Sequence, residues 1–167
     1  MTDAAAAGGS EAAVRAALDG VAHKLIACDP ALADTAAFCA HYGYPEDQSA
    51  NTIVVASRKP PGHNAACVVL ATTRLDVNGM VRRRLDARKV SFAPPELTVQ
   101  LTGMAMGGVT AFALPRELPL WIDAAVMERP WVIVGGGSRS LKVKVAPDVL
   151  ARLPNAEVVA GLATGPD

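Results

Sequence analysis

Two hydrogen-bonding side chains, Asn51 and Thr52, stand where an apolar strand begins. The stretch 49–56 reads SANTIVVA, and its last four residues are typical of a buried β-strand. An unpaired buried polar group costs on the order of 1–3 kcal/mol, so this pair has to satisfy its donors and acceptors. It either caps local backbone or faces a pocket, where an amide and a hydroxyl could bind a substrate.

A glycine-rich stretch, VGGGS at 134–138, offers a second kind of chemistry. Open backbone amides at the end of a strand can hold an anion or a developing oxyanion. The lysine and the spacing of a GxxxxGK[ST] phosphate loop are missing, and a strand is expected to follow where that loop needs a helix. We therefore predict a tight hairpin whose open amides could still line a site.

The segment 74–89 is locally basic, since it holds six of the chain's 16 Lys and Arg residues against Asp76 and Asp86. A basic strip is the electrostatic footprint of contact with phosphates, but the solvated face of an ordinary helix has the same composition. Both interpretations stay open from composition alone.

Other chemistries find little support in the sequence, and neither a metal nor a cofactor is predicted. His23, His41 and His63 are scattered, and none belongs to HExxH or to a Cys/His cluster. Cys39 and His41 are two positions apart on an expected helix, so they face away from each other. The three cysteines match no paired or zinc-type spacing and are interpreted as reduced packing residues. There is no GxSxG nucleophile motif.

Helices and strands interleave along the chain without regular βα repeats. We expect a flexible tail at 1–10, a helix with one apolar face from Glu11 to Leu25, and a second helix that starts at Asp34 or Thr35 and ends at Gly43. Strands at 52–57 and 65–72 are predicted to pair antiparallel. The remaining predictions are a helix at 76–85, a strand at 90–92, a helix at 94–101, strands at 119–123, 131–134 and 141–145, and a helix at 147–152.

This order of elements predicts a mixed α/β (α+β) fold with a curved, largely antiparallel sheet or partial barrel flanked by helices. With 167 residues the chain fits one domain, which we place at 11–167. The 51% hydrophobic content and the balance of 16 basic against 16 acidic residues argue against disorder and against nucleic-acid binding by bulk charge. No apolar run approaches the ~18 uncharged residues of a membrane span and no secretory signal is evident, so we expect a cytoplasmic protein without membrane contact.

Three stretches together resemble the YbaK/EbsC-like family, also called the prolyl-tRNA synthetase-associated editing domains. DTAAFCAHYGYPEDQSANTIVVAS is similar to the family's opening helix, turn and "KTLV" strand. KVSFAPPELTVQLTGMAMGGVTAFALPRELPLWID is similar to its central block with a GxxxP loop, and VIVGGGSRSLKVKVAPDVLARLPNAEVVAGL resembles its ending. The resemblance covers roughly residues 25–162, and the order and spacing of the three pieces make it specific.

The resemblance implies hydrolysis of the ester that joins a wrong amino acid to a tRNA. Family members are neither Ser nor Cys hydrolases; they hold the terminal adenosine and the aminoacyl group in a pocket, where glycine-loop amides and polar side chains position the ester and a water. The implied partner is the acceptor end of an aminoacyl-tRNA, with a synthetase as a further candidate, in a monomer or weak homodimer. The glycines and alanines of the expected pocket favour a small amino acid.

Two positions depart from the family pattern. The lysine of the "KT" pair falls on Asn51, which keeps hydrogen bonding but gives up a positive charge that would attract the terminal phosphate. The proline of the GxxxP loop falls on Ala111, which loosens the loop. The predicted site comprises Asn51, Gly107, Gly108 and Thr110 for catalysis, Thr52, Asp123, Gly136, Gly137 and Ser138 for substrate binding, and Arg82, Arg83 and Arg84 for contact with the tRNA.

Within this site, the amides of Gly107 and Gly108 are expected to face the ester, Thr110 to orient a water or the amino acid, and Asp123 to support the pocket or meet the α-amino group. Two alternatives stay open. Because the lysine is missing, the chain could be a catalytically inactive module that binds tRNA 3′ ends, nucleotide or a synthetase. It could also be a mixed α/β domain in which Asn51 caps a strand and the glycines only serve turns.

Overall fold

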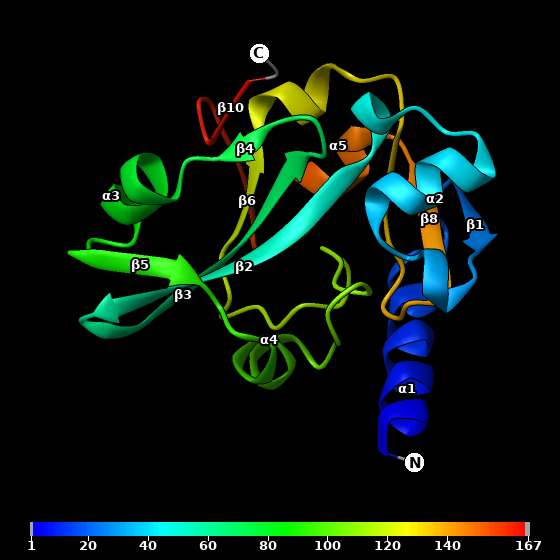
Figure 1. The fold of residues 1–167 in the computed structure, drawn as a ribbon, viewed down its shortest axis with the longest axis horizontal. Coiled ribbons are helices and arrows are strands. Elements are labelled where there is room, and N and C mark those ends of the chain that lie inside the picture. The colour runs from blue at the N-terminus through cyan, green and yellow to red at the C-terminus, as the bar shows by residue number, and fades with distance from the viewer. Residues whose placement is uncertain (1, 166–167) are drawn as a thin grey trace.

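The structure of the protein is a computed structural model that describes residues 2–165, with side chains from residue 10 onward. Its largest element is a five-stranded sheet in the order β5-β2-β3-β6-β9 (Figure 1). A three-stranded sheet, β1-β8-β7, stands at one end of the large sheet. The strands of the large sheet are β5 (Lys89–Phe92), β2 (Ala50–Lys59), β3 (Pro61–Leu70), β6 (Leu120–Asp123) and β9 (Ala156–Val159).

The centre of the large sheet is the long hairpin β2–β3, which confirms the predicted antiparallel pair. Its apolar residues bury both faces, as a run rich in valine and alanine requires. The pairs β3–β6 and β6–β9 are parallel, whereas the other strand pairs of the described residues are antiparallel. The fold is therefore the predicted mixed α/β type with largely antiparallel sheets, and these sheets are open rather than closed into a barrel.

Five α-helices of the described residues surround the sheets. Helix α2 (Thr35–Tyr42) ends at Gly43 and α4 (Pro95–Thr102) ends at Gly103, each glycine having the positive φ that closes a helix. Asp76 accepts hydrogen bonds from the first turn of a π-helical segment at Val77–Val81, which continues into α3. The other helices are α1 (Thr2–Ala17), α3 (Arg82–Arg84) and α5 (Pro147–Ala151).

The first helix differs from its prediction at both ends. It begins at Thr2 rather than at Glu11, and it ends at Ala17, before a turn at Gly20 with φ of 77°. Leu25, which was expected on the same helical face, lies instead on the strand β1 (His23–Ala27). The flexibility of residues 1–10 and the domain boundary at residue 11 stay predictions.

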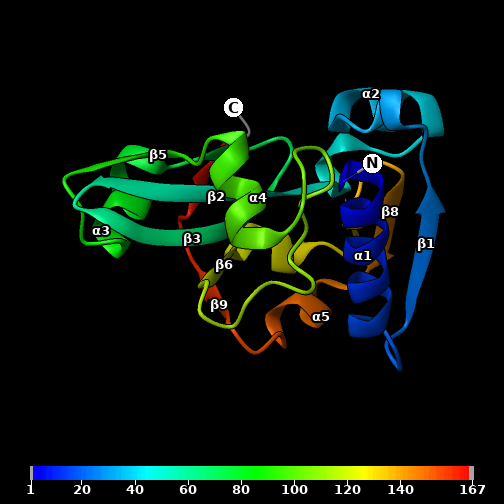
Figure 2. The ribbon, with the colours of Figure 1, turned by 90° about the horizontal axis from the view of Figure 1, so that it is seen from below.

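The small sheet is covered on both faces. On one face, Val14 of α1 and Leu18, just after that helix, pack with Val143 of β8 (Leu141–Val145) in the main hydrophobic core. On the other face, Phe38 of α2 packs with Ile133 of β7 (Val132–Gly135). Figure 2 shows α1 and α2 in these places around β8 and β1. The side chains of β8 are therefore buried on both faces, except that of Lys144, which is half-buried.

The two sheets meet where β2 begins. An isolated parallel bridge joins Ser49, just before β2, to Ile133 of β7. The strands β4 (Arg74–Leu75) and β10 (Ala163–Thr164) form a separate short antiparallel ladder. The junction at Ser49 brings the polar entrance of β2 next to the β7–β8 hairpin, and the pocket described below forms at this junction.

Candidate functional site

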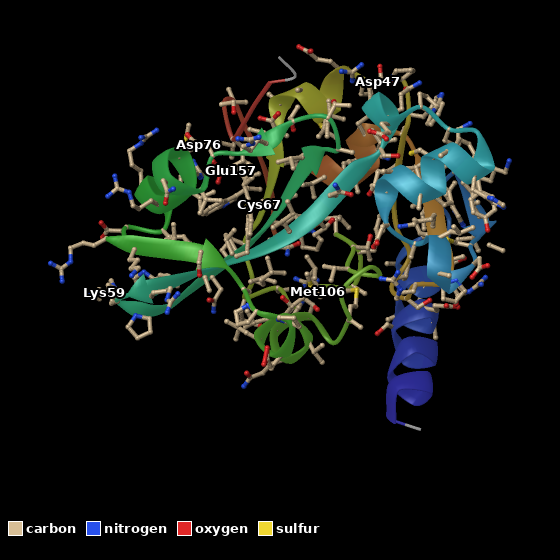
Figure 3. All side chains as sticks on the ribbon, viewed as in Figure 1. Asp47, Lys59, Cys67, Asp76, Met106 and Glu157 are labelled. Atoms are coloured by element: carbon tan, nitrogen blue, oxygen red, sulfur yellow. The ribbon has the colours of Figure 1, made fainter. Side chains whose placement is uncertain are left out.

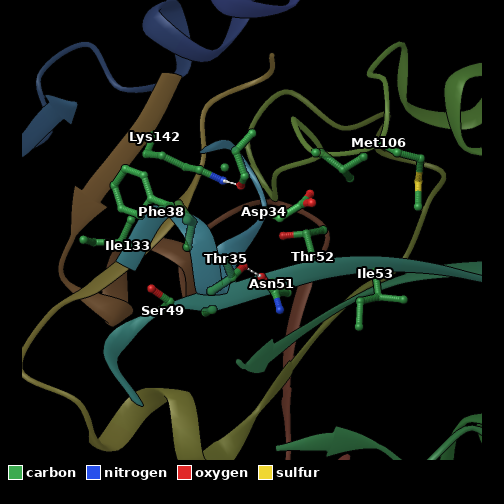
Figure 4. A pocket seen from close by; sticks show the side chains of 16 residues that line it. Asp34, Thr35, Phe38, Ser49, Asn51, Thr52, Ile53, Met106, Ile133 and Lys142 are labelled. Carbon is green, nitrogen blue, oxygen red and sulfur yellow. Dashed lines mark hydrogen bonds between the residues drawn. The ribbon is translucent and has the colours of Figure 1, made fainter. Parts of the chain in front are cut away.

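A cavity of about 250 Å³ lies at the junction of the two sheets (Figure 4). Its walls come from four parts of the chain: the start of α2, the start of β2, the loop around Gly107, and the strands β7 and β8. The predicted residues Asn51, Thr52 and Gly107 all line it. Three of the residues that the sequence predicts for the site therefore lie around one cavity.

Asn51 faces the cavity from β2 and is held by α2. Its Oδ1 accepts a hydrogen bond of 2.7 Å from the hydroxyl of Thr35, the first residue of that helix (Figure 4). Because the carbonyl oxygen is occupied, the two amide N–H donors are the part of Asn51 that a ligand can use. The side chain thus acts as an oriented donor in the cavity rather than as a cap of its own strand.

Thr52 adds a buried hydroxyl without a partner. Its Oγ1 makes no hydrogen bond to any described residue, although the atom is inaccessible to solvent. Buried polar atoms are nearly always paired, so an unpaired one that borders a cavity marks a place for a ligand atom or a water. The same residue also lines a second, apolar cavity of about 240 Å³ between β2 and α4.

Lys142 of β8 brings a positive charge into the site, which the sequence analysis missed. The residue is only 8% exposed, and its Nζ donates a 2.7 Å hydrogen bond to the backbone carbonyl of Ala33. Nζ also lies 5.6 Å from the centre of the Phe38 ring. Burial lowers the pKa of Lys142 below its ordinary value, because the charged amine loses its hydration.

The glycine loop contributes less to the cavity than predicted. Gly107 lines it with φ of 91°. Gly108 does not line it, and its N–H donates to Ala105 within the loop at 3.0 Å. Its carbonyl accepts from the N–H of Gly137 at 2.9 Å, and an added Cβ would come within 2.5 Å of the Cα of Ser138. Gly108 thus packs the loop on the hairpin, and Gly107 is the loop glycine at the cavity.

The predicted hairpin at VGGGS is present between β7 and β8, but most of it faces away from the cavity. Gly135 lines the cavity, whereas Gly136, Gly137 and Ser138 do not. The Ser138 hydroxyl donates to the carboxylate of Glu11 on α1 and accepts from the N–H of Ser140 at 3.1 Å. These residues hold the hairpin against α1, so we assign them a supporting place.

Thr110 and Asp123 also lie outside the cavity lining. Thr110 is fully buried, and its hydroxyl has no partner among the described residues. Asp123 is 3% exposed at the end of β6, where its Oδ1 accepts a hydrogen bond of 3.2 Å from the N–H of Ala163. The carboxylate that does stand at the rim is Asp34, whose side chain is 80% exposed and lies 3.7 Å from Arg139 Nη1.

The arginines of α3 lie at the far end of the large sheet from α2 in both ribbon views (Figures 1 and 2). Arg84 is already engaged, since it forms a 2.6 Å ion pair with Glu157 and stacks 4.7 Å from the centre of the Trp121 ring. Glu157 lies apart from Met106 of the cavity rim in Figure 3. Arg82 and Arg83 are exposed and remain available to a long substrate.

Among the described residues, no cysteine or histidine lines the cavity. Cys28, Cys39 and Cys67 are buried and free, and His41 is exposed on α2. The part of the chain that the structure describes contains no group of three or more His, Cys, Asp or Glu residues that could hold a metal ion. None of its helices is long and apolar enough to cross a membrane.

The open mixed α/β fold and the polar cavity beside the glycine loop agree with one class of domain, which a family model identifies. The chain belongs to the aminoacyl-tRNA editing domain family, whose model matches residues 29–153. The expected YbaK-type relationship is thereby confirmed.

Solved structures support the same fold. One is a protein proposed to be a trans-editing enzyme for prolyl tRNA synthetase; it is 24% identical, with a TM-score of 0.78 over 93% of this chain and 98% of that one. Another is the hypothetical protein APE2540, which is 26% identical, with a TM-score of 0.77 over 90% and 96% of the two chains.

Proposed function

We propose that this protein is a trans-editing hydrolase that cleaves the ester of a mischarged aminoacyl-tRNA carrying a small amino acid. The carrying observation is that one cavity collects the oriented amide of Asn51, the unpaired hydroxyl of Thr52 and the loop at Gly107. The family match and the likeness to a proposed trans-editing enzyme support an aminoacyl-tRNA as the substrate. A cytoplasmic location and a monomeric or weakly dimeric state are part of the proposal.

The reaction needs a water, an oriented ester and a group that stabilises negative charge. Water adds to the carbonyl carbon, the bond to the ribose oxygen breaks, and that oxygen takes a proton, which leaves a free amino acid and an uncharged tRNA. The N–H of Gly107 has no acceptor among the described residues, so it can donate to the developing oxyanion. Aminoacyl esters are already activated, so orientation rather than a strong base carries the rate.

Thr52 and Asn51 hold the reacting groups in this mechanism. The Thr52 hydroxyl has both a donor and two acceptor sites free, so it can orient the attacking water or the free ribose hydroxyl. The amide N–H groups of Asn51 donate to oxygen atoms of the terminal ribose. Neither role requires a charge at position 51.

The apolar cavity beside Thr52 is the proposed place for the amino acid side chain. It shares Thr52, Ile53, Met106 and Val109 with the polar cavity, and Val54 and Ala93 extend its apolar wall. A hydrocarbon side chain fits this lining, although a hydrophobic pocket discriminates only weakly against an isostere with one extra hydroxyl. We therefore expect alanine to be removed efficiently, with serine as a slower substrate.

The test is deacylation of a panel of mischarged tRNAs, above all tRNA for proline that carries alanine or cysteine. Wild type is compared with Asn51→Ala and with Asn78→Ala, an exposed asparagine outside the cavity. Hydrolysis by wild type and Asn78→Ala but not by Asn51→Ala supports the proposal.

The second candidate function is a binding module without turnover, which the asparagine in place of the family lysine favours. It predicts that wild type binds the same tRNAs without hydrolysing any of them, and that only Asn51→Lys shows hydrolysis. That outcome would contradict the editing proposal.

A further inference from the structure

Lys142 is a buried cation without a counter-ion. No carboxylate of the described residues lies within ion-pair distance of its amine. The groups that its amine contacts are the carbonyl of Ala33 and the face of the Phe38 ring. Asp34 and Arg139 influence its charge from beyond ion-pair distance, with opposite signs. Lysines are almost never buried to this degree unless they are paired, because an isolated charge loses its hydration without compensation.

The amine also has unused hydrogen bonds. An ammonium group has three N–H donors, and a single hydrogen bond, to Ala33, is found for Lys142 among the described residues. The residue lines the same cavity as Asn51 and Thr52 (Figure 4). A ligand that brings negative charge into this cavity would supply both the missing charge and the missing acceptors.

The placement of Lys142 follows from the sheet register. Gly135 of β7 pairs with Lys142 of β8, and the bridge between Ser49 and Ile133 brings β7 against the start of β2. Two positions on different sheets, 51 and 142, thereby share one cavity. A positively charged side chain at either position would therefore lie in this cavity.

We propose that Lys142 is the phosphate-binding cation of this site and that it contacts the phosphate of the terminal nucleotide of the tRNA. This inference rests on the proposed function, because it assumes that an aminoacylated terminal adenosine occupies the cavity. A charge-assisted hydrogen bond to a phosphate is short and strong, and it does not need the guanidinium fork of arginine. The phosphate also compensates the lost hydration of the amine, but only while substrate is bound. Substrate binding therefore favours the charged form of Lys142, and the charged form favours substrate binding.

The purely structural alternative is that Lys142 only fastens Ala33 to β8. A structural lysine would affect folding and binding of every ligand alike. A phosphate-binding lysine discriminates between ligands that carry the phosphate and ligands that lack it, and its loss can be repaired by a positive charge placed elsewhere in the cavity.

The experiment uses two non-hydrolysable probes that differ in one group. The first is 3′-alanylamino-3′-deoxyadenosine 5′-phosphate, in which an amide replaces the ester, and the second is the same compound without phosphate. Calorimetric titration compares wild type, Lys142→Met, the double variant Lys142→Met with Asn51→Lys, and Lys144→Met. Lys144 lies on the same strand, with its amine 4.2 Å from the centre of the Trp131 ring and outside the cavity, so it is the matched control.

We expect Lys142→Met to bind the phosphorylated probe at least about tenfold more weakly and the probe without phosphate nearly as well as wild type, as for the loss of a hydrogen bond between charged groups. The double variant should regain most of the affinity, and Lys144→Met should resemble wild type. Equal weakening for both probes, or none for either, would overturn the inference.

Deacylation assays on the same variants separate this inference from the proposed function. If wild type hydrolyses no mischarged tRNA but Lys142→Met selectively loses the phosphorylated probe, the editing proposal fails and the phosphate site stands. If wild type hydrolyses mischarged tRNA while the two probes respond alike, the phosphate site fails and editing stands.

Discussion

At the scale of single residues, the sequence predicted the polar entrance of β2 but not the lysine opposite it. Asn51 and Thr52 stand at the start of an apolar strand, and this combination of polar side chains with a buried strand is visible in the sequence. Lys142 lies in LKVKV, where alternation is the ordinary sign of a strand with one solvated face. That face is covered by α2, a contact between distant parts of the chain which no local pattern contains.

Thr35 is predicted to act through Asn51. Replacing Thr35 by valine removes the hydroxyl that holds the Asn51 carbonyl, so the amide can rotate away from its productive orientation. We expect kcat/KM for deacylation to fall about fivefold, which corresponds to one hydrogen bond of about 1 kcal/mol. Thr35→Ser keeps the hydroxyl and should stay close to wild type. Equal activity of the valine and serine variants would contradict the assignment.

The buried amine of Lys142 predicts an unusual dependence of stability on pH. Its pKa is lowered in the folded protein, chiefly by burial, so above the lowered pKa and below 10.5 the unfolded chain binds more protons than the folded one. Below the lowered pKa the folded protein therefore carries the whole free-energy cost of the buried charge. This cost disappears as the pH rises through the window, so the free energy of unfolding increases with pH. Lys142→Met lacks this rise.

Urea unfolding of wild type and Lys142→Met between pH 7 and pH 10 measures the effect as a difference. The charged or titratable groups that influence Lys142 are Cys28, Cys39, Asp34 and Arg139. Burial also raises the pKa of Cys28, so both proteins should carry Cys28→Ala. Burial raises the pKa of Cys67 to about 12, which lowers stability above pH 9 equally in both and cancels in the difference. A difference that does not change with pH would contradict the prediction.

At the scale of elements, the sequence predicted the pieces with strong local signals. The hairpin β2–β3, the glycine end of α2 and the turn at VGGGS all follow from strand-forming runs and turn residues. The parallel strand β9 was missed because AEVV has little strand character without its neighbour β6. The end of α1 was predicted wrongly because the spacing of Val21 and Leu25 fits a helix. In the structure Gly20 lies in a turn with positive φ, which ends the helical region before these residues.

Gly108 is predicted to be essential for the contact between the glycine loop and the β7–β8 hairpin. Alanine at this position would press its Cβ onto the backbone of Ser138, so we expect a loss of about 2–3 kcal/mol in stability, typical of overpacking. Because the loop would have to move away from the cavity, binding of the alanylamino probe should fall as well.

Gly103→Ala is the matched control for this prediction. Gly103 has φ of 75° and open space around its Cβ, so alanine there costs about 1–2 kcal/mol of backbone strain without displacing a neighbour. We expect it to lower the melting temperature but to leave probe binding intact. A Gly108→Ala variant that binds the probe as well as Gly103→Ala does would contradict the assigned role.

At the scale of the whole molecule, the basic helix α3 lies at the far end of the large sheet from α2, whose first residues line the cavity (Figure 1). A small substrate in the cavity cannot touch α3, whereas an acceptor stem that leaves the cavity along the large sheet can. The arginines of α3 can therefore affect the binding of a long substrate such as a tRNA, but not the hydrolysis step in the cavity. This separation gives a test of the proposed tRNA contact that does not depend on any cavity residue.

The double variant Arg82→Ala with Arg83→Ala should raise KM for whole mischarged tRNA and leave kcat unchanged. Each lost phosphate contact should also reduce the slope of log KM against log salt concentration by about one. Arg84 is left in place because its ion pair with Glu157 and its contact with Trp121 make it part of the fold. Arg152→Ala, at an exposed arginine directly after α5, controls for the general loss of charge. If the arginine pair guides the acceptor stem, the double variant should hydrolyse a short aminoacylated adenosine phosphate at the wild-type rate. An equal loss of activity on tRNA and on this short substrate would show that the two substitutions disturb the fold rather than a contact with the tRNA.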